Sequence, residues 1–124
     1  CTPGWPVDRY AEGSRQVMLI SLREHQNAGD ELCLRSHRRI LDGFAGSEEY
    51  WESEVYHRTR RIELRIIFPV ERKCQRATLT VRSTGKTVAL GPERYHTLPD
   101  GRQALCWTKA GPRLNERYLL RWEW

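Results

Sequence analysis

Hydrophobic and polar residues alternate along much of the second half of the chain. Apolar residues occupy every second position from Ile62 to Phe68, with charged residues between most of them. A period of two places alternate side chains on opposite faces of a strand. Pro69 ends the pattern, because proline cannot donate a ladder hydrogen bond. We therefore expect a half-buried strand that ends at Pro69.

Shorter stretches of the same kind follow towards the C-terminus. Thr84-Gly85 separates the first two of them, which predicts a tight hairpin. Clusters that contain proline and glycine separate the later ones, as turn residues do. The last stretch carries Tyr118 and three further large apolar residues on one face. The strands predicted in this part of the chain cover 77–83, 86–90, 94–98, 103–108 and 117–124.

The first half of the chain is less regular. Residues 15–24 contain a β-rich apolar run, so we expect a strand there. Residues 1–14 contain two prolines and two glycines, which predicts an irregular lead-in. Ser47 followed by two glutamates suits the N-terminus of a helix, so we expect a short helical turn near 47–52.

Together these patterns predict an all-β protein. About 7–9 short strands with almost no helical period indicate an antiparallel β-sandwich, with an immunoglobulin-like architecture among the candidates. A chain of 124 residues supports one domain with a real core. We expect that domain to cover residues 15–124. Because the chain starts at Cys1 without a methionine, we also expect it to be a piece of a larger protein.

The four cysteines, at positions 1, 33, 74 and 106, allow three pairings into two disulfides. Cys33 and Cys106 each lie beside apolar residues, which is typical of buried thiols that behave as small hydrophobic side chains. We therefore favour reduced thiols and a cytoplasmic protein, with secretion as the alternative. No apolar run approaches the length of a membrane span, so we expect no membrane contact.

Three residues resemble the pattern of an immunoglobulin variable-type domain. Cys33 and Cys106 lie 73 residues apart, and Asp100 precedes Cys106 by six positions. That resemblance implies a Cys33–Cys106 disulfide as one alternative. Ala104 stands where that family has its corner tyrosine, and Trp51 follows Cys33 by 18 residues. The chain is therefore similar to that family in sandwich architecture only.

The net charge of +5 suggests an anionic partner such as nucleic acid. Arginine supplies 18 of the 21 basic residues, a skew that is typical of a GC-rich genome and favours a bacterial source. Two basic runs, Arg35–Arg39 and His57–Arg61, could bind phosphate groups if they lie on neighbouring strands, since arginine can donate two hydrogen bonds to one phosphate. The four glutamates between the runs could also neutralise them. The arginines of this predicted anion site are Arg35, Arg38, Arg39, Arg58, Arg60 and Arg61.

Catalytic and metal motifs are weak in this sequence. The four histidines have neither the spacing nor the cysteine neighbours of a zinc site, so we expect no metal and no cofactor. Cys106, His96 and Asp100 could form a thiol–histidine–acid set, but Cys106 lies between Leu105 and Trp107, an apolar setting that does not favour a thiolate. We therefore expect a protein without enzymatic activity.

Tryptophans offer another kind of ligand contact. Trp122 and Trp124 share one face of the last predicted strand, and Trp107 could lie on a neighbouring strand. Exposed rings in such a row would suit a carbohydrate. The same spacing also suits a core cluster, which we favour.

Protein–protein recognition or regulation within a larger protein is the function that we favour. Sandwich domains recognise partners through their loops or through an edge strand, and the partner would be another protein or another domain of the parent chain. The segment 42–53 combines acidic and aromatic residues, and we expect it to be the main contact loop, with 110–116 as a second. The predicted contact residues are Tyr50, Trp51 and Glu52.

Overall fold

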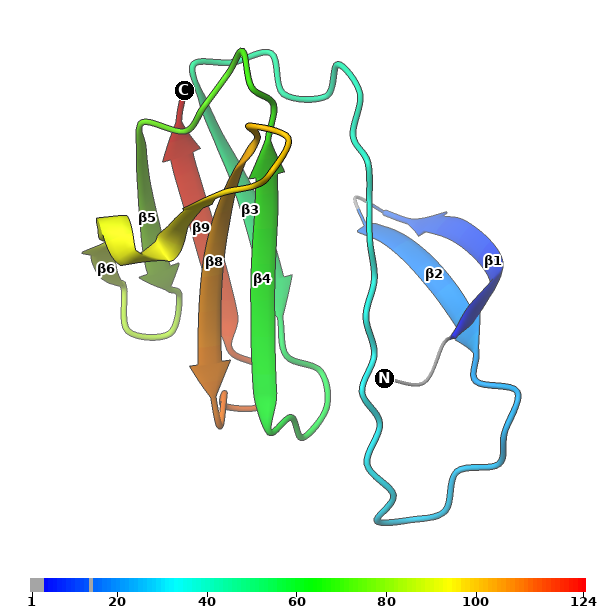
Figure 1. Cartoon of the computed structure of the whole chain (residues 1–124). Helices are drawn as coiled ribbons and strands as arrows, with labels where there is room; N and C mark the ends of the chain where they lie inside the picture. Colours follow the sequence, from blue (N-terminus) through cyan, green and yellow to red (C-terminus); the bar gives the residue numbers. More distant parts are fainter. Residues whose placement is uncertain (1–3, 14) are drawn as a thin grey trace. The chain divides into compact units, whose positions relative to one another are not determined.

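The structure, a computed structural model, describes residues 4–13 and 15–124 (Figure 1). The chain divides into two compact units, the first ending at Leu41 and the second beginning at Asp42. A single domain over residues 15–124 stays a prediction. The predicted all-β fold class is confirmed, because strands make up nearly all of the regular structure.

The first unit contains a two-stranded antiparallel sheet. Strand β1, Trp5–Glu12, pairs with β2, Arg15–Ser21, which confirms the strand expected in that region. The prediction of an irregular segment is wrong for residues 5–12, which form β1. Its ladder depends on the pairing with β2, and the register shifts between Pro6 and Asp8, where a proline is tolerated. Residues 1–3 and 14 of the expected lead-in lie outside the described residues.

The second unit contains two antiparallel sheets. The four-stranded sheet has the order β3-β9-β5-β6, and the three-stranded sheet has the order β4-β8-β7. The strands of the first are β3 (Glu48–Glu54), β9 (Arg117–Glu123), β5 (Arg76–Val81) and β6 (Lys86–Ala89). Those of the second are β4 (Arg61–Phe68), β8 (Gln103–Ala110) and β7 (Tyr95–Thr97). Each strand predicted after residue 60 is thus present, including the β5–β6 hairpin.

The two sheets of the second unit pack face to face around an aromatic core. Phe68 of β4 contacts Trp122 of β9 with ring centroids 5.8 Å apart, and Trp107 of β8 lies 4.9 Å from Tyr118 of β9. Trp122 and Phe68 are almost completely buried, as is Leu105. In Figure 1, β4 and β8 accordingly lie in front of β3 and β9. This arrangement is a β-sandwich, because both sheets contribute side chains to one core.

Two details of the predicted sandwich differ from the structure. Residues 48–54 form β3 rather than a helical turn, because pairing with β9 outweighs the weak helical start at Ser47. The 3₁₀ turn lies at Pro92–Arg94, and among the described residues no helix is long and apolar enough to cross a membrane. The connectivity also departs from the immunoglobulin pattern: β3 and β4 lie in opposite sheets, whereas constant-type domains keep their first two strands together.

Of the three cysteines that the structure describes, one differs from the expected reduced state. Cys33 is disulfide-bonded, so the prediction of a reduced thiol is wrong there. Cys74 and Cys106 are free thiols, which confirms the reduced state for both and excludes the Cys33–Cys106 pair suggested by the immunoglobulin resemblance. Cys1 lies outside the described residues.

Arg72 anchors the segment that precedes β3 to the sandwich. The Arg72 guanidinium donates hydrogen bonds to the carbonyl oxygens of Phe44, at 2.6 Å, and Gly46, at 2.5 Å. The same group lies 4.2 Å from the ring centre of Trp124. Phe44 in turn packs edge-on against Trp122 at 5.3 Å. The segment that precedes β3 is therefore anchored, which positions β3 at the edge of the four-stranded sheet.

Candidate functional site

The side of the four-stranded sheet that points away from the core is a polar surface, which we call the outer face. Side chains alternate along a strand, so the residues between the buried Leu79, Leu120 and Trp122 and their equivalents lie on this face. The register brings them into adjacent rows. The outer face consists of Glu48, Tyr50, Glu52, Glu54, Arg76, Thr78, Thr80, Arg82, Thr87, Ala89, Arg117, Arg121 and Glu123, together with Leu119, which is only 5% exposed.

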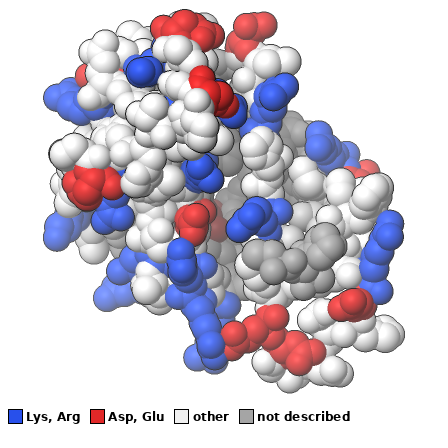
Figure 2. All heavy atoms as spheres, in the orientation of Figure 1, with Lys and Arg blue, Asp and Glu red and all other residues white. Residues whose placement is uncertain are grey.

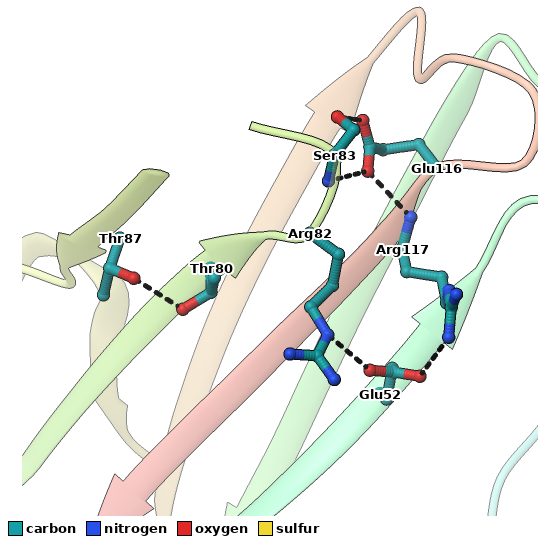
Figure 3. A network of polar contacts seen from close by, with 7 residues as sticks. All are labelled: Glu52, Thr80, Arg82, Ser83, Thr87, Glu116 and Arg117. Atoms are coloured by element: carbon teal, nitrogen blue, oxygen red, sulfur yellow. Dashed lines mark hydrogen bonds and ion pairs between the residues drawn. The ribbon is translucent and has the colours of Figure 1, made fainter. Parts of the chain in front are cut away.

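Ion pairs between strands cover much of the outer face. Glu52 of β3 accepts from Arg82 Nε at 3.2 Å and lies 3.7 Å from Arg117 Nη1 (Figure 3). Arg76 of β5 pairs with Glu123 of β9 at 2.5 Å. Exposed ion pairs contribute little to stability individually. Their effect here is to place carboxylates and guanidinium groups at set positions on one surface.

Tyr50 is the large aromatic side chain of the outer face. It lies opposite Arg121 in the register of β3 and β9, and its side chain is 61% exposed. Arg121 also lies 3.7 Å from Glu48, on the next row. A shallow depression on the sheet is lined by these two charged residues together with Arg76, Thr78, Trp122 and Glu123. An exposed aromatic ring beside paired charges is thus the main chemical feature of this face.

The three predicted contact residues lie on a strand, and not in a loop as expected. Tyr50 and Glu52 lie on the outer face. Trp51 lies on the inward side of β3, where it packs against the core and its indole N–H donates to Ser53 Oγ at 3.1 Å. The strand period therefore brings Tyr50 and Glu52 together and directs Trp51 to a structural position.

Glu116, which the sequence analysis did not single out, is a buried acid that directly precedes β9. Only 5% of it is exposed. Its carboxylate accepts from the backbone N–H of Arg117 at 2.9 Å, from Ser83 N–H at 3.2 Å and from the Ser83 hydroxyl (Figure 3). The Ser83 hydroxyl bond lowers the pKa of Glu116 most, and the two backbone bonds lower it further against the effect of burial. Glu116 therefore ties the β5–β6 turn to the start of β9.

The two basic runs do not form the aligned strands that the anion-binding prediction required. Residues 30–40, which include Arg35, Arg38 and Arg39, have no regular secondary structure. Arg58 and Arg60 lie in the connection between β3 and β4, and Arg61 starts β4 and pairs with Glu63 at 2.7 Å. Figure 2 shows basic and acidic side chains interspersed over the visible surface. A continuous guanidinium stripe across neighbouring strands is therefore not how these residues are arranged.

In the thiol–histidine–acid set that we considered and did not favour, the acid Asp100 has a different partner, Arg102. Asp100 accepts from Arg102 Nε at 2.7 Å and from Arg102 N–H at 3.1 Å, and these bonds lower its pKa. In the part of the chain that the structure describes, no hydrogen bond or ion pair joins His96 to Cys106 or to Asp100. Over the same residues, no cluster of histidine, cysteine and acidic side chains is arranged to hold a metal ion.

The tryptophans considered for a carbohydrate platform belong to the core. Trp107 is 6% exposed and Trp122 is 2% exposed. The rings of Trp122 and Trp124 are nearly perpendicular, at 86°. The core cluster that we favoured is therefore confirmed, and the alternative of an exposed row of rings is excluded, because this face of the sheet packs against the opposite sheet.

No protein-family model, curated protein or solved structure matches the chain. The outer face is therefore interpreted from its own chemistry.

Proposed function

We propose that the sandwich is a non-enzymatic module that recognises a protein partner through its outer face, with Tyr50 as the anchor. The observation that carries this proposal is the 61% exposure of Tyr50 on a strand whose neighbouring residue Trp51 packs against the core. Tyrosine and arginine are enriched among residues that dominate protein interfaces. Tyr50 lies in register with Arg121, so both kinds of side chain meet on the outer face.

The surroundings of Tyr50 support a protein ligand. Interfaces combine an aromatic centre with a polar rim that supplies about one hydrogen bond per 100–200 Å². On the outer face the rim consists of ion-paired Glu52 and Arg117 on one side and Arg76 and Glu123 on the other. These groups present both signs of charge around Tyr50, so they can form hydrogen bonds and ion pairs with polar groups of a partner.

Selection of peptides from a random displayed library on the full chain tests the proposal. The Tyr50→Thr variant removes the ring and retains a residue that favours strands. Val70→Ala is the matched control, because Val70 is an exposed apolar residue, 51% exposed, outside both predicted contact loops and outside the four-stranded sheet. We expect selected peptides to bind the wild type and the Val70 variant alike and to bind the Tyr50 variant at least tenfold more weakly. Equal binding to the wild type and the Tyr50 variant would overturn the proposal.

A further inference from the structure

β3 is an edge strand. The residues whose backbone N–H and C=O groups point away from the sheet are the same residues whose side chains lie on the outer face. β3 ends the strand order of its sheet, with β9 on its paired side. At its two ends, Trp124 N–H donates to Ser47 C=O at 3.2 Å and Val55 N–H donates to Glu116 C=O at 3.0 Å. Odd-numbered residues therefore bond towards β9. By the alternation of an antiparallel ladder, the N–H and C=O groups of Glu48, Tyr50 and Glu52 turn away from β9.

The charge of β3 restricts which strand could pair with that edge. Four of its seven residues are glutamates, and none is basic. A second copy of β3 would place glutamates against glutamates, and like charges directly opposite each other destabilise a strand pair. Charged edge residues commonly prevent self-association of this kind. A strand with basic residues at the matching positions meets attraction instead of repulsion.

β4 forms the other long edge of the sandwich, and it carries charges of both signs. β4 ends the order of the three-stranded sheet, and its alternate charged residues are Arg61, Glu63 and Arg65. Arg61 and Glu63 already pair with each other at 2.7 Å. The basic residues of the outer face lie on β5 and β9 or beside them, behind β3, so an added strand would meet the glutamates first.

We propose that the β3 edge binds an extended segment of a partner protein with lysine or arginine at every second position, added as an antiparallel fifth strand. This inference rests on the proposed function and specifies its ligand. Main-chain hydrogen bonds to Glu48, Tyr50 and Glu52 hold the segment. Its basic side chains lie opposite Glu48, Tyr50 and Glu52 on the outer face, and the middle one lies beside the ring of Tyr50.

A fluorescent peptide of four lysine–valine repeats is a suitable probe, measured by anisotropy with the full chain. We expect saturable binding of this peptide and none of a peptide with glutamate in place of lysine. N-methylation at the lysine positions removes the N–H groups that would face β3, whereas N-methylation at the valine positions leaves them. We therefore expect the first modification to abolish binding and the second to preserve it.

Variants of the protein test the charge. The double change Glu48→Gln and Glu52→Gln should weaken binding of the lysine peptide about three- to tenfold, the sum expected from two cross-strand charge pairs. Glu48→Gln alone should weaken it by a smaller factor and leaves the contacts of Glu52 intact. Glu63→Gln, an equivalent change on the β4 edge, is the matched control and should leave binding unchanged.

Three results would overturn the inference: no binding of the lysine peptide, equal loss or retention with both N-methylated peptides, or equal weakening by the Glu63 control. If any of these occurs while library peptides still require Tyr50, then the outer face binds through side chains alone. In that case the proposed function stands and the strand addition fails.

Discussion

Replacing Glu116 by alanine should destabilise the sandwich while leaving the outer face chemically unchanged. Three donors lose their acceptor: the N–H and hydroxyl of Ser83 and the N–H of Arg117. Bonds to an ionised carboxylate contribute roughly 1.5–3 kcal/mol each, but Ser83 is exposed and water can replace part of this, so we expect a loss of about 2 kcal/mol in all. That corresponds to a shift of the urea midpoint by about 1–2 M.

Urea titration followed by tryptophan fluorescence measures this loss, because four of the five tryptophans lie in the second unit. Glu93→Gln is the control: Glu93 is 67% exposed and pairs only with its neighbour Arg94 at 3.5 Å. We expect that variant to unfold at the wild-type midpoint. An unchanged midpoint for Glu116→Ala would show that the three hydrogen bonds do not contribute to stability.

The pH dependence gives an independent test of the same carboxylate. The Ser83 hydroxyl bond holds the pKa of Glu116 below its ordinary value of 4.5, so the folded state favours the ionised form. The stabilisation is therefore complete above about pH 4.5 and disappears as the pH falls through the lower, folded-state pKa. The difference in unfolding free energy between wild type and Glu116→Gln should shrink between pH 6 and pH 3. A constant difference over that range would refute this assignment of the charge.

Three further predictions follow from the structure. Arg72→Met should lower the unfolding free energy by about 1–2 kcal/mol, measured by the same urea titration, because two carbonyl hydrogen bonds and the contact with Trp124 are lost. Burial raises the pKa of the Cys74 thiol, so iodoacetamide at pH 8 should modify the half-buried Cys106 first in native protein and Cys74 only after unfolding, as peptide mass mapping would show. Filter binding of single-stranded DNA should be weak at about 50 mM salt and absent at about 200 mM, since the basic runs form no aligned stripe; retention at the higher salt would revive the anion-binding hypothesis.

The strands after residue 60 were predictable because local pattern and tertiary environment agree there. From Ile62 to Phe68 the period of two marks one inward face, and the structure buries that face against β9. The same holds for the last strand, where Tyr118 and Trp122 are both buried. The turn residues between these strands also act locally, so the β5–β6 hairpin follows from Thr84-Gly85 alone.

The sequence alone therefore determined the fold class, the position of the later strands and the inward face of each. Tertiary structure decided the sheet to which each strand belongs, because alternation is the same in either sheet. It also decided that the acidic segment 48–54 is a strand, since pairing with β9 outweighs its polar composition. The candidate site depends on that pairing: it is the register with β9 that turns Tyr50 outward beside Arg121 and Trp51 into the core.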